Sequence, residues 1–120
     1  MEGLRRVRGT ELRYLLTWWL ARESPLTVGE LIECLEMQGF DVGGRPSKTI
    51  SDALRWEMRR GRVIKGGRNS YRIGYVPRAT EYRIRQRVLA MRAEVAGMSL
   101  EAGRGEGKEL SDEFWDAWGF

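Results

Sequence analysis

The sequence contains no histidine, and Cys34 is its only cysteine. Histidine is the commonest general base and metal ligand near neutral pH, and a disulfide or a zinc or iron–sulfur site within one chain needs several thiols. We therefore expect a protein that is not an enzyme, with no catalytic residues, no metal site and no cofactor. A chain without an internal disulfide is also typical of a reducing, intracellular compartment.

The sequence also lacks a long hydrophobic run. Its longest nearly apolar stretch, residues 14–21, is too short to cross a bilayer. Residues 1–6 contain no apolar run of the kind that begins a secretory signal peptide. These features predict a cytoplasmic protein with no membrane partner.

Charge is distributed unevenly along the 120 residues. The whole chain has 21 basic and 17 acidic residues, whereas residues 45–92 alone contain 14 basic and 3 acidic residues. Of the basic residues, 18 are arginine, which makes bidentate contacts with phosphate and guanine. An arginine-rich composition is also typical of a G+C-rich genome. The middle of the chain is the strongest candidate for binding a nucleic acid.

Apolar spacing and turn residues predict four helices and one β-hairpin. Thr27 and Glu30 have the spacing of a capping box, and Ser47 is the expected N-cap of the third helix. Gly66 and Gly67 are expected to form the turn of the hairpin. The predicted helices cover about residues 10–23, 28–38, 47–60 and 80–96, and the hairpin covers residues 63–73.

This order of helix, helix, helix, hairpin and helix resembles the winged helix-turn-helix superfamily. Leu26–Leu31 (LTVGEL) resembles its positioning helix, Thr49–Val63 (TISDALRWEMRRGRV) its recognition helix and Gly66–Arg72 (GGRNSYR) its wing. The chain also resembles small actinobacterial proteins of this type, which indicates a bacterial source. The resemblance implies a fold that is mainly α with a small β-hairpin wing, over residues 1–96.

The resemblance further implies sequence-specific binding of duplex DNA by a dimeric transcriptional regulator associated with the nucleoid. The helix over residues 47–60 would lie in the major groove, and the wing over residues 63–73 would contact phosphates. Arg55 is the best candidate for bidentate contact with guanine, and Asp52 would accept a hydrogen bond from cytosine or orient Arg55. The expected DNA-binding residues are Ser47, Lys48, Thr49, Ser51, Asp52, Arg55, Arg59, Lys65, Arg68 and Arg72.

The basic face of the third helix is expected opposite four apolar residues that point inward, Ile50, Ala53, Leu54 and Met58. Two other interpretations of this face stay open. Exposed arginines often form nothing more than a solvated surface. Winged domains also serve as protein-interaction scaffolds without DNA binding, and this is our alternative function.

Two features depart from the superfamily pattern. Glu57 stands where many members have an aliphatic residue, so we expect Met58 or Trp56 to fill that part of the core. The connection from Gln38 to Pro46, which begins with the expected C-cap Gly39, is longer than the short turn of the simple motif. The angle of the recognition helix is therefore less well defined by the sequence than its existence.

The last predicted helix has an apolar seam at nearly heptad spacing, formed by Ile84, Val88, Met91 and Val95. Two interpretations fit this seam. It packs on the first helix of the same chain, or it forms the interface of a homodimer that places two recognition helices on successive half-sites.

The C-terminal part of the sequence is different in composition. Residues 97–110 are rich in glycine and polar residues and are expected to form a flexible linker. Residues 111–120 combine acidic residues with Phe114, Trp115 and Trp118, which would share one face of a short helix. Three roles are open for this tail: it binds a protein partner, it folds back on the basic face, or it completes the core.

Overall fold

The computed structural model describes residues 4–102. Within them the chain is mainly helical and forms two small sheets. Most of the predicted linker and all of the tail, with Phe114, Trp115 and Trp118, lie outside the described residues. The elements are β1 (Arg5–Arg6), α1 (Gly9–Arg22), β2 (Leu26–Thr27), α2 (Val28–Met37), β3 (Phe40–Asp41), α3 (Pro46–Arg59), β4 (Val63–Lys65), β5 (Ser70–Ile73) and α4 (Arg78–Ala102).

The helix starts follow from local sequence. The Thr27 hydroxyl accepts from the Glu30 backbone N–H at 3.1 Å, and the Glu30 carboxylate accepts from the Thr27 N–H at 2.8 Å. This confirms the predicted capping box. Ser47 is not the N-cap of α3, because the helix already begins at Pro46 with Arg45 as its N-cap. Proline suits this first position, since its φ is preset and its missing N–H has no partner there in any case.

The predicted hairpin is confirmed, and it belongs to a three-stranded antiparallel sheet in the order β2–β5–β4. Leu26 and Thr27 of β2 pair with Tyr71 and Ser70 of β5. A second, parallel pair joins β1 to β3. Neither β2 nor the β1–β3 pair was predicted, because strands of two residues show no periodicity in the sequence.

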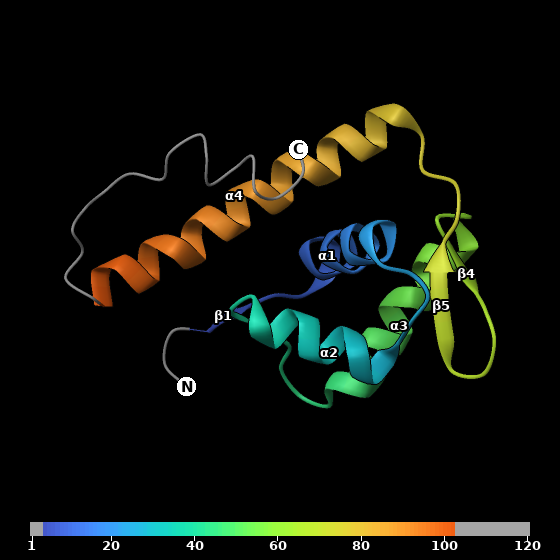
Figure 1. Cartoon of the computed structure of the whole chain (residues 1–120), viewed down its shortest axis with the longest axis horizontal. Coiled ribbons are helices and arrows are strands. Elements are labelled where there is room, and N and C mark those ends of the chain that lie inside the picture. Colours follow the sequence, from blue (N-terminus) through green and yellow to red (C-terminus); the bar gives the residue numbers. More distant parts are fainter. Residues whose placement is uncertain (1–3, 103–120) are drawn as a thin grey trace.

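The core lies around α1, which has α4 on one side and α2 and α3 on the other (Figure 1). All residues from Leu15 to Leu20 are buried. Trp18 and Trp19 pack edge to face, with ring centroids 5.1 Å apart. The apolar spacing predicted one buried face for this helix; the structure buries nearly its whole circumference here, because α4 covers a second face.

The apolar seam of α4 packs into this core. Ile84, Val88 and Met91 are buried, and the half-buried Val95 packs against the same cluster. The assignment of Ile84, Val88 and Met91 to a dimer interface is therefore wrong, and the alternative of packing on α1 is confirmed for these three residues. The reason is that α1 presents a complementary apolar face within the same chain.

The C-terminal end of α4 differs from the prediction. The helix continues through Gly97 to Ala102, so the first residues of the predicted linker are helical. A single glycine costs a helix only about 1 kcal/mol relative to alanine, and the residues after it are mostly good helix formers. The glycine-alternating sequence begins only at Gly103.

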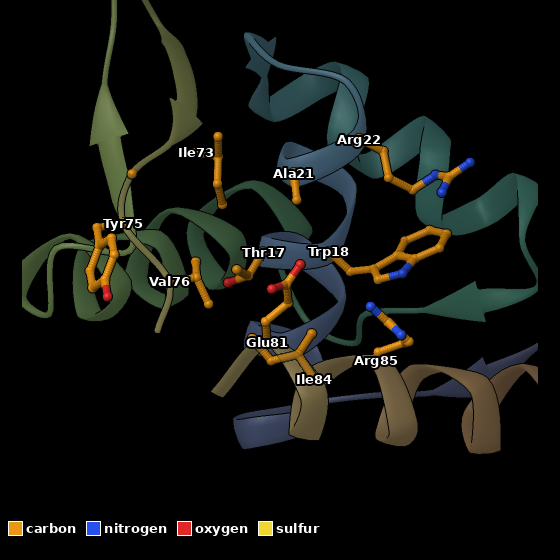
Figure 2. A pocket seen from close by; sticks show the side chains of 11 residues that line it. Thr17, Trp18, Ala21, Arg22, Ile73, Tyr75, Val76, Glu81, Ile84 and Arg85 are labelled. Carbon is orange, nitrogen blue, oxygen red and sulfur yellow. The ribbon is translucent and has the colours of Figure 1, made fainter. Parts of the chain in front are cut away.

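The approach of α4 to α1 leaves a hollow below the end of β5 (Figure 2). Its volume is about 440 Å³. Residues from α1, from the connection between β5 and α4, and from the first turns of α4 line it.

Candidate nucleic-acid interface

Helix α3 presents five of its seven predicted contact residues to solvent. Ile50 and Leu54 are fully buried and anchor the helix, whereas Ala53 and Met58 are only half-buried. The opposite face is therefore fixed in space. Ser47, Lys48, Asp52, Arg55 and Arg59 are exposed on it, and Thr49 and Ser51 are half-buried.

Asp52 holds two of the cations on this face. Its carboxylate lies 3.1 Å from the Lys48 ammonium and 3.1 Å from the Arg55 guanidinium. The hydrogen bond from Lys48, together with the charges of Lys48 and Arg55, holds the pKa of Asp52 below its usual range. Asp52 therefore stays ionised near neutral pH and orients both side chains at the surface.

The hairpin presents its basic residues in two directions. Lys65 pairs with Tyr71 across the sheet and its ammonium lies 5.7 Å from the Tyr71 ring centroid, whereas Arg72 pairs with Ile64. Residues adjacent along a strand point to opposite faces. Lys65 therefore lies on the face that contains the buried Tyr71, and Arg72 lies on the other face. Arg68 is exposed at the turn between them.

A hollow of about 410 Å³ connects the hairpin with the two helix starts. Ser47 and Ser51 of α3 line it together with Asn69 and Tyr71 of the hairpin. The N-cap Thr27 and the first two residues of α2, Val28 and Gly29, complete the lining. Sequence reasoning missed these residues as candidates, although the capping box marked the start of α2. A helix start places partial positive charge at such a position.

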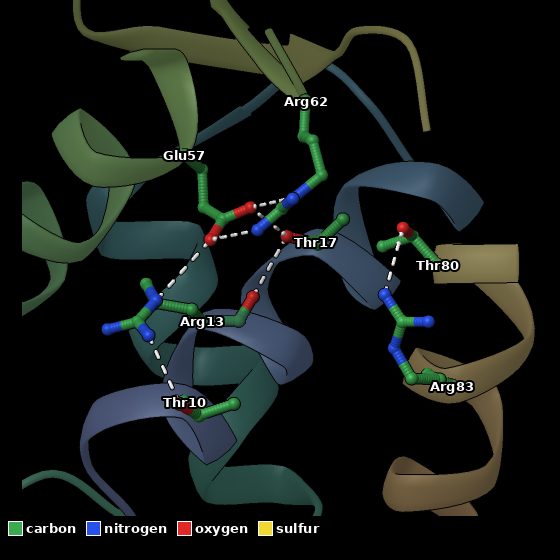
Figure 3. A network of polar contacts seen from close by, with 7 residues as sticks. All are labelled: Thr10, Arg13, Thr17, Glu57, Arg62, Thr80 and Arg83. Atoms are coloured by element: carbon green, nitrogen blue, oxygen red, sulfur yellow. Dashed lines mark hydrogen bonds and ion pairs between the residues drawn. The ribbon is translucent and has the colours of Figure 1, made fainter. Parts of the chain in front are cut away.

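Glu57 fixes the C-terminal end of α3 to the rest of the molecule (Figure 3). Its carboxylate is buried with 1% of the side chain exposed, and it accepts two hydrogen bonds from Arg62, at 2.6 and 3.0 Å. The Arg13 guanidinium and the Thr17 hydroxyl each lie 3.4 Å from it. Glu57 thus links α3 to α1 and to the entrance of the hairpin.

Glu57 itself occupies the core position where an aliphatic residue is typical, because three polar partners compensate its burial. The expectation that Met58 or Trp56 has to fill this space is therefore wrong, although the half-buried Met58 packs against the hydrophobic core. Trp56 is 38% exposed and lies between the guanidinium groups of Arg13 and Arg60, each 4.7 Å from its ring centroid. Arg60, which was not among the predicted contacts, is therefore positioned beside the exposed face of α3.

Residues 4–102 contain no cluster of side chains suited to hold a metal ion. No helix in that part of the chain is long and apolar enough to span a membrane. No protein-family profile matches the sequence, and comparison with curated proteins and with solved structures finds no match.

Proposed function

We propose that this protein binds duplex DNA in a sequence-specific way, as a winged helix-turn-helix transcriptional regulator that acts in the cytoplasm on the bacterial nucleoid. In this proposal α3 (Pro46–Arg59) lies in the major groove, and the hairpin (63–73) contacts the phosphates beside it. The order of α1, β2, α2, α3 and hairpin, with β2 paired to β5, supports a winged arrangement.

One observation is the main support for this proposal. The N-terminal half of α3, the start of α2 and the turn of the hairpin border one polar hollow. The elements that border it also have the exposed basic residues Lys48, Arg55 and Arg68, and the acidic Asp52 pairs with the first two. A convex basic helix beside a basic hairpin fits the shape and charge of a groove with its flanking phosphates.

Individual roles follow from position. Arg55, preoriented by Asp52, is suited to a bidentate contact with a guanine edge. Lys48 and Arg59 lie on either side of it along the helix and would contact phosphates or neighbouring bases. Lys65 and Arg68 would contact phosphates from the hairpin, whereas Arg72 points from the opposite face and would contribute least.

The first experiment is fluorescence anisotropy of a labelled random duplex, titrated with the protein across a salt series. A phosphate-binding surface predicts that the logarithm of the affinity falls linearly with the logarithm of the salt concentration. Arg55→Ala with Arg59→Ala should weaken binding, and the loss of the Arg59 phosphate contact should reduce the salt slope by about 1.

The matched control removes two exposed arginines from α4, as Arg78→Ala with Arg83→Ala. It has the same net charge as the α3 variant but leaves the proposed surface intact, so its salt slope should stay close to that of the unsubstituted protein. Circular dichroism checks that both variants are folded. Equal losses in both would contradict a specific role for α3. Absence of binding at low salt would favour the protein-interaction scaffold.

A further inference from the structure

The hollow below the end of β5 combines an apolar wall with charged groups (Figure 2). Trp18 and Ile84 are buried in its wall. Arg85 lies beside the Trp18 ring, and the Glu81 carboxylate points from α4 toward α1. A volume of about 440 Å³ lies in the range of pockets that hold small organic groups.

Positive charge dominates the side of the hollow around Trp18. The Arg22 guanidinium lies over the Trp18 ring at 4.9 Å from its centroid. Arg92 is buried nearby on α4; burial first, and then the charge of Arg22, lowers the pKa of Arg92 to about 9. Arginines this close together favour an anionic partner.

An exposed aromatic residue also lines the hollow. Tyr75 is 74% exposed, and its ring adds apolar surface to that of the buried Trp18 and Ile84. The occupant should therefore combine aromatic rings with negative charge.

The same chain contains a segment of this composition. Residues 111–120 include four aromatic and three acidic residues and no basic residue. We propose that this segment docks into the hollow between α1, the β5–α4 connection and α4 of its own chain. The aromatic side chains Phe114, Trp115 and Trp118 fill the hollow, and the acidic residues face its arginines.

The length of the chain permits this return. Arg85 lies 17 residues before Ala102 on α4, a distance of about 26 Å along the helix axis. Phe114 lies 12 residues beyond Ala102, and an extended chain of that length spans about 40 Å. The segment reaches the hollow without any change in α4.

The polar groups of residues 111–120 also complement those of the hollow. The indole N–H groups of Trp115 and Trp118 find an acceptor in the Glu81 carboxylate, and the tail carboxylates pair with Arg22 and Arg85. No residue of α3 lines the hollow. The docking is therefore independent of the proposed DNA contacts, and either proposal can fail while the other holds.

The test uses the full chain with its isoleucine methyl groups labelled for NMR. Ile73 and Ile84 line the hollow, whereas Ile32 and Ile50 lie elsewhere and serve as internal controls. Replacing Phe114, Trp115 and Trp118 together by alanine should shift the methyl signals of Ile73 and Ile84, because aromatic ring currents are lost, and leave those of Ile32 and Ile50 in place.

A pair of charge variants tests the acidic residues. Asp112→Asn with Glu113→Gln and Asp116→Asn should move the Ile73 and Ile84 signals toward their positions in the alanine variant. The control, Glu106→Gln with Glu109→Gln, removes acidic charge from the preceding stretch and should leave the signals unchanged.

Three outcomes would overturn the docking. Unchanged Ile73 and Ile84 signals would show that the aromatic residues lie elsewhere. Shifts at all isoleucines would make the segment part of the core. Shifts that disappear on dilution would show that the segment docks into a second copy of the chain. Shifts that are confined to Ile73 and Ile84 and do not depend on concentration would establish docking within the same chain.

Discussion

Glu57 lies in the core with 1% of its side chain exposed, and its carboxylate has Arg62, Arg13 and Thr17 around it. Removing one member of a buried charge pair leaves the others desolvated without compensation, which costs about 3 kcal/mol or more. We expect Glu57→Ala to lower the free energy of unfolding by about this amount, measured by urea denaturation. The exposed Glu33→Ala is the control and should change it by less than about 0.5 kcal/mol.

A double substitution separates the contribution of the Glu57–Arg62 ion pair to stability from the contribution of core packing. Glu57→Leu with Arg62→Leu replaces both charges by apolar side chains and should recover most of the stability lost in Glu57→Ala. If Glu57→Ala were as stable as the Glu33→Ala control, the carboxylate would contribute nothing to holding α3 on α1.

At the scale of elements, the turn between α2 and β3 is held by Gly39. This residue has φ +89°, and a Cβ added to it would lie 2.6 Å from Cγ1 of Val95 on α4. Gly44 has φ +64° with open space around it. Both alanine variants meet backbone strain of about 1–2 kcal/mol, but only Gly39→Ala also pushes on α4.

We therefore expect Gly39→Ala to lower the free energy of unfolding by about 1–3 kcal/mol more than Gly44→Ala, as measured by urea denaturation. Gly39→Ala with Val95→Ala should remove the additional steric part. Equal losses in the two single variants would show that α4 moves aside at no cost.

The helices and the hairpin were predictable because their signals are local. Thr27 and Glu30 marked a helix start within four residues, and Gly39 marked the end of the same helix. On α3 the buried Ile50 and Leu54 correctly indicated which face is exposed. Ala53 and Met58 are less buried than predicted, because Glu57 occupies the neighbouring core position.

At the scale of the whole molecule, Glu11 connects three elements. Its carboxylate accepts hydrogen bonds from Arg5 before α1, at 3.0 and 3.1 Å, and from Arg87 of α4 at 3.1 Å. The hydrogen bond from Arg5 is the main cause that lowers the pKa of Glu11. In the unfolded chain, Glu11 has the ordinary glutamate pKa of about 4.3.

The pKa of Glu11 is lower in the folded state than in the unfolded chain. The stabilisation from its contacts with Arg5 and Arg87 is therefore fully present above about pH 4.3 and is lost as the pH falls through the folded-state pKa. We expect Glu11→Gln to lower the free energy of unfolding by about 1 kcal/mol at neutral pH. This difference should shrink toward zero in acid. Thermal unfolding of both proteins from neutral pH to about pH 3 measures it. A difference that stays constant with pH would assign the effect to packing.

The sequence by itself determined the helices, the hairpin and the concentration of basic residues in the middle of the chain. Each of these depends on neighbours along the chain, so periodicity, caps and composition reveal it. The tertiary structure decided the pairing of β1 with β3, the addition of β2 to β5 and the packing of the α4 seam on α1. It also decided which partners allow Glu57 to be buried. These contacts join segments far apart in sequence, and each depends on which surfaces meet once the chain has folded.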